Sequence, residues 1–259
     1  MRYHAARNAV TRPRAIPEPG PCAHVAAGAS IVMIVGTGML ATAFAPLAAR
    51  HDLLVHAAGV SNSRCTDTAA FERERMAVSR SLESGRACER LLHFSTCSID
   101  DPVDGDTPYV RHKLAMEAMV SQHAGHVIVR LPQVVGVTPN PHTLVNYLRD
   151  RIVRGERFDV WRNARRNLID ADDVRAIVMA LLESGVRSAI VNVANPLDYA
   201  VLDIVNALER TTGRQGRYDL VDRAGGHRID VDAIRPLMSR AGVRFEPDYL
   251  ERLIRKYYA

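Results

Sequence analysis

Residues 91–119 read LLHFSTCSIDDPVDGDTPYVRHKLAMEAM, and this stretch decides the fold and the site. Its apolar start predicts a buried strand that ends at the hydroxyl pair Ser95-Thr96. A polar loop rich in Asp, Pro and Gly follows, and a helical pattern then opens with Tyr109 and Lys113. Residues at i and i+4 project from the same face of a helix. Because ligands bind at the carboxyl ends of parallel strands, we expect Thr96, Tyr109 and Lys113 to face one crevice.

The chemistry of these three residues suits proton transfer. A positive charge beside a phenol favours the phenolate, so Lys113 is predicted to lower the pKa of Tyr109 from its ordinary value of about 10 and make it an effective acid or base. An ordinary helix with a surface Tyr and Lys is the simpler interpretation. However, the chain has only two lysines, Lys113 and Lys256, among 34 Lys and Arg residues. With eight Tyr, roughly 0.06 Tyr-x-x-x-Lys pairs are expected by chance, which favours the catalytic interpretation.

An upstream motif predicts a phosphate-binding turn. Residues 31–35 (IVMIV) form a buried-strand pattern that runs into residues 36–41 (GTGMLA), and a helical pattern follows. Strand, glycine turn and helix in that order are typical of dinucleotide-binding folds. Gly36 permits the tight turn, Gly38 lets a pyrophosphate approach the backbone, and the helix N-terminus offers unpaired N–H groups. A glycine turn in any strand-helix unit is the alternative, and the downstream Tyr and Lys favour phosphate binding.

These motifs carry a resemblance to a known family. A Ser-Thr pair at a strand end, with Tyr-x-x-x-Lys opening a helix thirteen residues after the Thr, resembles the short-chain dehydrogenase/reductase superfamily. The segments RLPQVVG (130–136) and RRNLIDADDV (165–174) resemble its extended branch of nucleotide-sugar epimerases and dehydratases. The resemblance covers about two thirds of the chain. It implies an α/β enzyme with a Rossmann-like, doubly wound parallel sheet.

The resemblance also implies roles for individual residues. Thr96, Tyr109 and Lys113 would be catalytic, with NAD or NADP as the cofactor and a nucleotide sugar as the substrate. Cofactor contacts would come from Gly36, Gly38, Met39, Leu40, Ala57, Ala58, Tyr109, Lys113, Leu131 and Pro132. Substrate contacts would come from Gln133, where an Asn is usual, and from Arg166, whose guanidinium fork suits a diphosphate. Arg130 is expected to form a structural ion pair.

The chain departs from the family in its first half. Ala57, in a pattern that resembles the family's fourth strand, follows Gly36 by only 21 residues. A strand-helix-strand unit takes about 30 residues, so the two units that normally intervene cannot fit. We therefore expect the second and third strands to be missing and the first strand to lie nearer an edge. The missing part holds the residue that reads the adenosine ribose, so NAD and NADP stay open. Residues 61–64 either supply substitute contacts or form a solvated loop.

Other segments are expected to lie outside the sheet. Residues 1–29, with four prolines and no hydrophobic periodicity, are predicted to be a disordered extension. Residues 30–259 would form the Rossmann-like domain, interleaved with a small substrate lobe at about 137–172 and 195–259, and the tail from residue 219 is expected to be helical. Asp172 and Asp173 are interpreted as a turn and helix cap. That interpretation argues against a metal site.

The composition excludes several other functions. No apolar run approaches the roughly 18 residues of a membrane span, and the four cysteines lack metal-binding spacing, so we expect reduced thiols in a cytoplasmic protein. The net charge of +5 permits a polyanionic partner, and the phosphates of a cofactor and a nucleotide sugar satisfy that hint. With 5% aromatic residues and no nucleic-acid motif, no nucleic acid is expected. A homodimer is expected by analogy alone.

The residues after Thr96 narrow the reaction. A 4,6-dehydratase of this family needs an Asp-Glu pair directly after the Thr, whereas this chain has Cys97 and Ser98. Epimerisation or carbonyl reduction therefore remains, for the sugars of surface polysaccharides. A 4-epimerase needs a secure adenosine pocket, which the short first half weakens, so a reductase or dehydrogenase with an exchanging cofactor is a rival. The alternative from another class is a non-catalytic protein that binds a dinucleotide or a sugar nucleotide.

Overall fold

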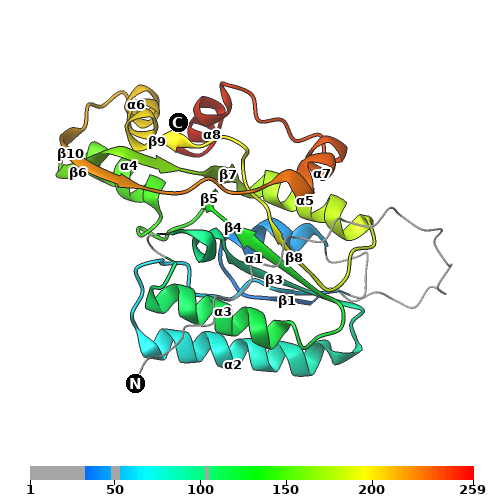
Figure 1. Ribbon diagram of the computed structural model, residues 1–259. Coiled ribbons are helices and arrows are strands. Elements are labelled where there is room, and N and C mark those ends of the chain that lie inside the picture. Colours follow the sequence, from blue (N-terminus) through cyan, green and yellow to red (C-terminus); the bar gives the residue numbers. More distant parts are fainter. Residues whose placement is uncertain (1–32, 48–52, 103–104) are drawn as a thin grey trace, which may run out of the picture.

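The computed structural model describes residues 33–47, 53–102 and 105–259, and the predicted extension at residues 1–29 lies outside these ranges. At the centre of the described chain is a five-stranded parallel sheet in the order β1-β2-β3-β4-β8 (Figure 1). Its strands are β1 (Met33–Val35), β2 (Leu53–His56), β3 (Arg90–Thr96), β4 (His126–Leu131) and β8 (Ala189–Asn192).

Helices cover both faces of this sheet, which explains why its strands are largely apolar on both sides. α2 and α3 cover one face, and α1 and α5 cover the other (Figure 1). These helices are α1 (Met39–Phe44), α2 (Thr68–Ser84), α3 (Pro108–Val120) and α5 (Ala171–Glu183), with short 3₁₀ turns η1 (Ala45–Leu47), η2 (Gly85–Ala87) and η3 (Cys97–Asp100). The prediction of a Rossmann-like, doubly wound α/β fold is confirmed.

The sheet is short on the side of β1. This strand lies at an edge of the described sheet and pairs in parallel with β2, with Met33 opposite Leu54 and Val35 opposite His56. β2 is also the next strand along the chain in the described residues. The predicted loss of the second and third strands is therefore confirmed.

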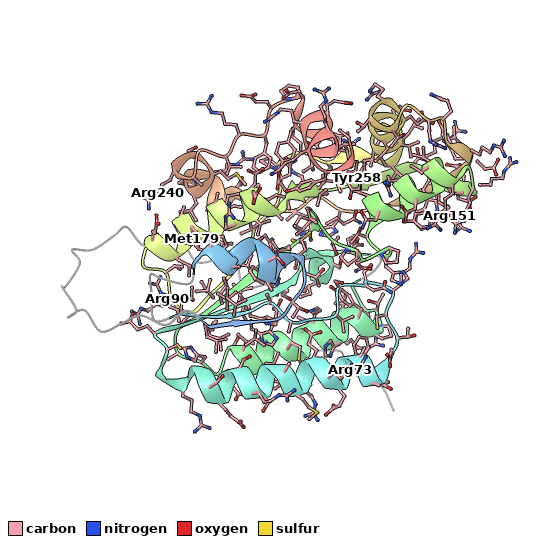
Figure 2. The ribbon with its side chains drawn as sticks, turned by 180° about the vertical axis from the view of Figure 1, so that it is seen from behind. Arg73, Arg90, Arg151, Met179, Arg240 and Tyr258 are labelled. Carbon is pink, nitrogen blue, oxygen red and sulfur yellow. The ribbon has the colours of Figure 1, made fainter. Side chains whose placement is uncertain are left out.

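A second layer lies beyond the carboxyl end of β4 (Figure 1). In it β6 pairs in parallel with β10 and antiparallel with β9, and β5 pairs with β7. The strands are β5 (Gln133–Val135), β6 (Arg157–Arg166), β7 (Leu168–Asp170), β9 (Tyr199–Ala200) and β10 (Arg217–Gly225). The helices are α4 (Leu144–Arg154), α6 (Val201–Thr212), η4 (Asp232–Ile234), α7 (Arg235–Arg240) and α8 (Tyr249–Tyr258). In the reverse view, Arg73 of α2 and Arg240 of α7 lie on opposite sides of the molecule (Figure 2).

Two local predictions are wrong. The apolar run of residues 127–135 (VIVRLPQVV) predicts one buried strand, but the structure breaks it at Pro132 into β4 and β5, because proline has no N–H to donate to a ladder. The tail from residue 219 begins in strand β10 and becomes helical only at η4. β10 forms by pairing with β6, about sixty residues earlier, and such a distant partner leaves little local signal.

No helix of the described ranges is long and apolar enough to cross a membrane.

Candidate active site

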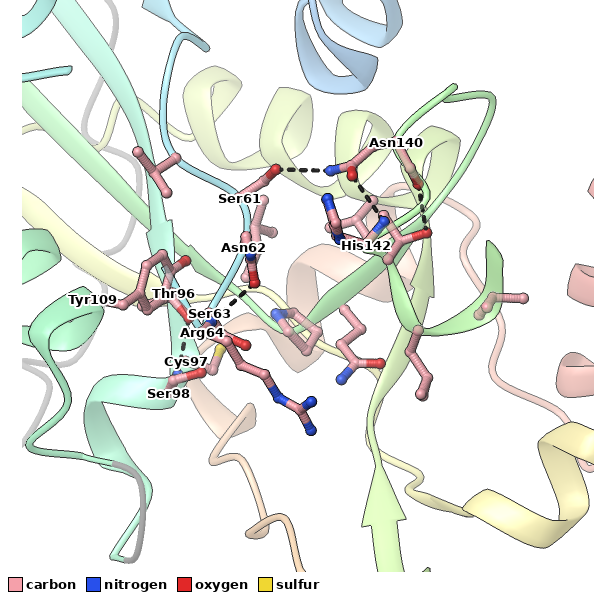
Figure 3. Close-up of a pocket in the computed structure, with 18 of the residues that line it drawn as sticks. Ser61, Asn62, Ser63, Arg64, Thr96, Cys97, Ser98, Tyr109, Asn140 and His142 are labelled. Atoms are coloured by element: carbon pink, nitrogen blue, oxygen red, sulfur yellow. Dashed lines mark hydrogen bonds between the residues drawn. The ribbon is translucent and has the colours of Figure 1, made fainter. Parts of the chain in front are cut away.

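A cleft of about 1750 Å³ opens between the carboxyl ends of the central strands and the second layer. All of the site residues predicted from the sequence line it except Gly36, which lies beside it in the glycine turn. They are Gly38, Met39, Leu40, Ala57, Ala58, Thr96, Tyr109, Lys113, Leu131, Pro132, Gln133 and Arg166. Residues 61–64 also line the cleft, and Asn140 donates a hydrogen bond to Ser61 across it (3.2 Å; Figure 3).

Thr96, Tyr109 and Lys113 come together on one side of the cleft. Thr96 ends β3, and its hydroxyl hydrogen-bonds the phenol of Tyr109, which lies beside it in Figure 3. Thr107 caps α3 by accepting from the N–H of Val110 (3.3 Å), so Tyr109 falls in the first turn. Lys113 follows one turn later, with its Nζ 5.8 Å from the centre of the Tyr109 ring. All three catalytic candidates are buried.

The prediction that the pKa of Tyr109 lies below its ordinary value is wrong for this structure. Burial raises the pKa of the phenol above 10, and the positive charge of Lys113 and the Thr96 hydroxyl oppose that rise without overcoming it. The negative charge of Glu74 then adds to the rise. The lysine therefore acts in the expected direction, but burial of the phenol outweighs it.

Glu74 is one of the residues around this site that the sequence did not reveal. It projects from α2 into the protein and is buried, and its Oε1 accepts from Lys113 Nζ at 2.7 Å. Its Oε2 accepts from the N–H of Val60 at 2.7 Å and lies 3.0 Å from His112 Nε2. Burial opposes ionisation of Glu74, but Lys113 and these hydrogen bonds hold the pKa of the carboxyl below its usual value.

The glycine turn has the shape that its sequence predicts. Gly36 has φ +127°, and a Cβ there would come within 2.7 Å of the Ala57 carbonyl group. Gly38 has an extended backbone, and a Cβ there would meet nothing within 4 Å. The backbone of Gly38 is therefore open to the cleft, while that of Gly36 is packed against Ala57 and Ala58, directly after β2. Close approach also explains Gly136, where a Cβ would come within 2.6 Å of the Met39 sulfur.

The wall of the cleft formed by the second layer is polar and basic. Gln133 lies at the start of β5, and its Oε1 is buried without a hydrogen-bond partner among the described residues. Arg166 and Arg223 both lie over the ring of Trp161, with guanidinium carbons 5.9 and 5.6 Å from its centre. Arg223 and His227 also line the cleft, and His227 Nδ1 is 3.1 Å from Asp101 Oδ2. Neither residue was predicted, because both come from the segment expected to be helical.

Two charged clusters prove to be structural. Arg130 pairs with buried Glu117 through two hydrogen bonds of 3.0 and 2.8 Å, which confirms the prediction of an ion pair. The interpretation of Asp172 and Asp173 as the cap is wrong, because Asp170 caps α5 by accepting from the N–H of Asp172 (2.8 Å). No group of three His, Cys, Asp or Glu side chains in the described ranges could hold a metal ion.

The parallel sheet, the glycine turn and the Thr-Tyr-Lys cluster at the carboxyl ends of the strands together define a protein of the short-chain dehydrogenase/reductase type. The profile of the "NAD dependent epimerase/dehydratase family" matches residues 40–194, which is more than half of the chain. The chain belongs to this family. The predicted enzyme class, the extended branch and the use of NAD or NADP are thereby confirmed, whereas the choice between the two cofactors stays open.

Solved structures share the fold at low sequence identity. RMD from Pseudomonas aeruginosa, complexed with NADPH, is 16% identical with a TM-score of 0.68, over 87% of this chain and 96% of that one. MoeE5, in complex with UDP-glucose and NAD, is 18% identical with a TM-score of 0.68, over 86% and 96%. UDP-glucuronic acid 4-epimerase from Bacillus cereus, with UDP-glucuronic acid and NAD, is 19% identical with a TM-score of 0.65, over 80% and 74%. No curated protein matches the sequence.

Proposed function

We propose that this chain is an epimerase or carbonyl reductase that acts on the sugar of a nucleotide sugar, using Thr96, Tyr109 and Lys113. The observation that carries the proposal is the convergence of a hydroxyl, a phenol and an ammonium group in one cleft, at the carboxyl end of β3. The same cleft continues to the glycine turn on one side and to Arg166 on the other. It can therefore take a dinucleotide and a nucleotide sugar together.

The residues present fit a nicotinamide cofactor. Gly38 would accept the pyrophosphate, because its backbone faces open space where any larger side chain would intrude. Ala57 and Ala58 supply a wall of small side chains next to that turn, and Leu131 and Pro132 supply an apolar wall near Thr96. When bound, the nicotinamide would supply hydride transfer to or from the sugar carbon.

Tyr109 moves the proton that accompanies this chemistry. Its phenol would donate to the sugar oxygen in reduction or accept from the sugar hydroxyl in oxidation, while Thr96 hydrogen-bonds the same oxygen. The ordinary state of Tyr109 here is the neutral phenol, since burial raises its pKa. A neutral phenol is the form that donates the proton in carbonyl reduction.

Cys97 and Ser98 support the exclusion of 4,6-dehydration. Cys97 lies at the start of η3, where it packs against the apolar core beside the cleft, and burial raises the pKa of its thiol well above the usual value. Ser98 donates its N–H to Thr96 Oγ1 (3.1 Å), which helps to hold that hydroxyl in place. Neither residue offers the acid and base that removal of water from a sugar needs.

The second layer would bind the nucleotide. We propose that residues 137–172 and 195–259 form the substrate lobe, that Arg166 binds the diphosphate and that Gln133 binds the sugar or phosphate through its unpartnered Oε1. A guanidinium group offers paired donors to phosphate oxygens. The protein would act in the cytoplasm, where nucleotide sugars are supplied for surface polysaccharides, and a homodimer stays a prediction by analogy.

The test is turnover with a panel of UDP-, GDP- and dTDP-sugars, including their 4-keto forms, with NAD, NADH, NADP or NADPH. Absorbance at 340 nm detects net reduction or oxidation, and chromatography of the nucleotide sugars detects an epimer formed without net change. Tyr109→Phe is expected to lower turnover by about 100- to 10,000-fold. The control is Tyr218→Phe, because Tyr218 lies outside the cleft and packs on Phe158.

Two outcomes would contradict the proposal. If Tyr109→Phe turns over as fast as the wild type, the phenol does not transfer the proton. If nucleotide sugars bind but no member of the panel is converted, the alternative of a non-catalytic binding protein is the better description.

A further inference from the structure

Glu74 presents a carboxylate to the protein interior directly behind the catalytic lysine. It lies in the middle of α2 and is only 4% exposed. A buried charge is costly unless it is paired and hydrogen-bonded. Three groups supply that pairing in this structure, namely the ammonium of Lys113, the N–H of Val60 and the imidazole of His112.

The surroundings are shaped around this ion pair. A Cβ on Gly59 would come within 2.8 Å of Glu74 Oε1 and 2.9 Å of Lys113 Nζ. Any larger residue at this position would therefore have to displace the ion pair. His112 is held on the carboxylate by Phe71, whose ring stacks on the imidazole with centres 4.4 Å apart. The loop after β2, helix α2 and helix α3 therefore meet at one carboxylate.

This carboxylate also acts on the phenol of the site. Lys113 has three N–H donors, and Glu74 accepts a hydrogen bond from one of them. The charge of Lys113 favours ionisation of Tyr109 and that of Glu74 opposes it. Two further titratable side chains, His56 on β2 and His93 on β3, lie near the ion pair. Burial lowers the pKa of both imidazoles, so they stay neutral near pH 7.

We propose that Glu74 is a positioning residue of the active site, which fixes the ammonium of Lys113 and sets the net charge that Tyr109 experiences. The proposal rests on the proposed function for its kinetic consequence, but the placement of Lys113 does not depend on turnover. It assigns a role to a carboxylate that never touches the substrate.

The chain offers a matched control. Glu117 is equally buried, at 4% exposed, and lies on α3 one turn after Lys113. It pairs with Arg130 and accepts from the hydroxyl of Ser95 (2.6 Å) rather than contacting the lysine. Glu74→Gln and Glu117→Gln therefore remove the same charge from similar depth, and only the first change touches Lys113.

The first measurement uses the small number of lysines. In protein labelled with ¹⁵N at the lysine side chain, Lys113 and Lys256 give the only two ammonium signals. Lys256 pairs with Asp170 and Asp172, far along the chain, and is an internal reference. We expect Glu74→Gln to shift the Lys113 signal and to speed its hydrogen exchange about tenfold, since a partner that restrained the ammonium has lost its charge. Glu117→Gln should leave both signals unchanged.

The second measurement is the pH profile of turnover. We expect Glu74→Gln to move the ionisation of Tyr109 to lower pH by about 0.5 to 1 unit, because a negative charge near the phenol is gone. Glu74→Asp, which restores the charge, should return the profile towards the wild type, and Glu117→Gln should not move it. A merely structural role would lower stability in both Gln variants without moving the profile.

The outcomes separate this proposal from the proposed function. An unchanged Lys113 signal in Glu74→Gln, or an equal change in Glu117→Gln, overturns the role of Glu74 whether or not a substrate is found. If Glu74→Gln does not fold, hydrogen exchange of the Lys113 ammonium in the wild type tests the proposal. Exchange as fast as that of a solvent-exposed lysine overturns it. A shifted signal with no turnover on any sugar upholds the placement and refutes the enzymatic proposal instead.

Discussion

Gly36 and Gly38 are two residues apart but are expected to respond in opposite ways to alanine. At Gly36 the backbone has φ +127°, which costs a residue with a side chain about 1–3 kcal/mol. The new methyl group would also lie 2.7 Å from the Ala57 carbonyl, and backbone atoms cannot move aside easily. We expect Gly36→Ala to lose about 3 kcal/mol of unfolding free energy, which corresponds to about 6–12 °C in melting temperature.

At Gly38 the same substitution costs the fold little. Its backbone (φ −80°, ψ −176°) suits alanine, and no atom lies within 4 Å of the new methyl group. The lower entropy of the unfolded chain gains about 0.4–1 kcal/mol, and the loss of a favourable N-cap residue at α1 offsets it. If a pyrophosphate approaches this backbone, however, the methyl group occupies its place. We expect the affinity for NAD or NADP to fall at least about tenfold, or 1.4 kcal/mol.

The assay combines urea unfolding of the cofactor-free protein with calorimetric titration of NAD and of NADP. The reasoning predicts a stability defect in Gly36→Ala and a binding defect without a stability defect in Gly38→Ala. If Gly38→Ala binds both dinucleotides as tightly as the wild type, phosphate does not approach this turn. A wild-type free energy of unfolding for Gly36→Ala would show that the turn is not constrained by Ala57.

Three further changes probe the polar groups around the site. His93 is buried with both ring nitrogens unpartnered among the described residues, and burial holds its pKa well below 6.5. Below about pH 6.5 the imidazole is therefore protonated in the unfolded chain but not in the folded chain, so the free energy of unfolding falls by about 1.4 kcal/mol for each pH unit of acidification. His93→Leu should flatten that slope in urea unfolding between pH 7 and 5. An unchanged slope would refute this role of His93. Arg130→Ala leaves buried Glu117 without its bidentate partner and should cost about 3–5 kcal/mol, measured in the same way against an exposed control, Arg235→Ala. Tyr249→Phe removes the hydroxyl that accepts from the N–H of Asp170 and donates to Asp173. It should lower the free energy of unfolding by about 1–3 kcal/mol. A loss below about 0.5 kcal/mol, roughly the error of such measurements, would show that water replaces the hydroxyl.

The features that could be predicted from the sequence are those that depend on the pattern of residues close together in the chain. Apolar runs gave the strands of the central sheet, and the glycine turn and Tyr109-Lys113 spacing placed the residues that now line one cleft. The short interval between Gly36 and Ala57 was enough to predict the smaller sheet, because chain length limits what can lie between two strands.

The missed residues depend on contacts between distant segments. Arg223 and His227 reach the cleft only because β10 pairs with β6, and β10 itself has no strong alternating pattern. Glu74 did leave a signal, since it lies one turn before Val78 on the buried face of α2. Glu72, two residues earlier, is exposed and pairs with Arg75, so charge alone could not tell the two carboxylates apart.

The face of the sheet beneath α2 and α3 explains how the site survives the loss of two strands. Near the amino ends of the strands this face is apolar, with Leu54, Leu91 and Ile128 packed in one cluster. Towards the carboxyl ends the same face becomes polar, with His56 and His93 followed by the groups that serve Lys113. These positions lie on β2, β3 and β4, in the loop after β2 and on the two helices that cover these strands. The missing strands would have extended the sheet beyond β1, so their loss shortens the sheet on that side and leaves Thr96, Tyr109 and Lys113 with the neighbours that position them.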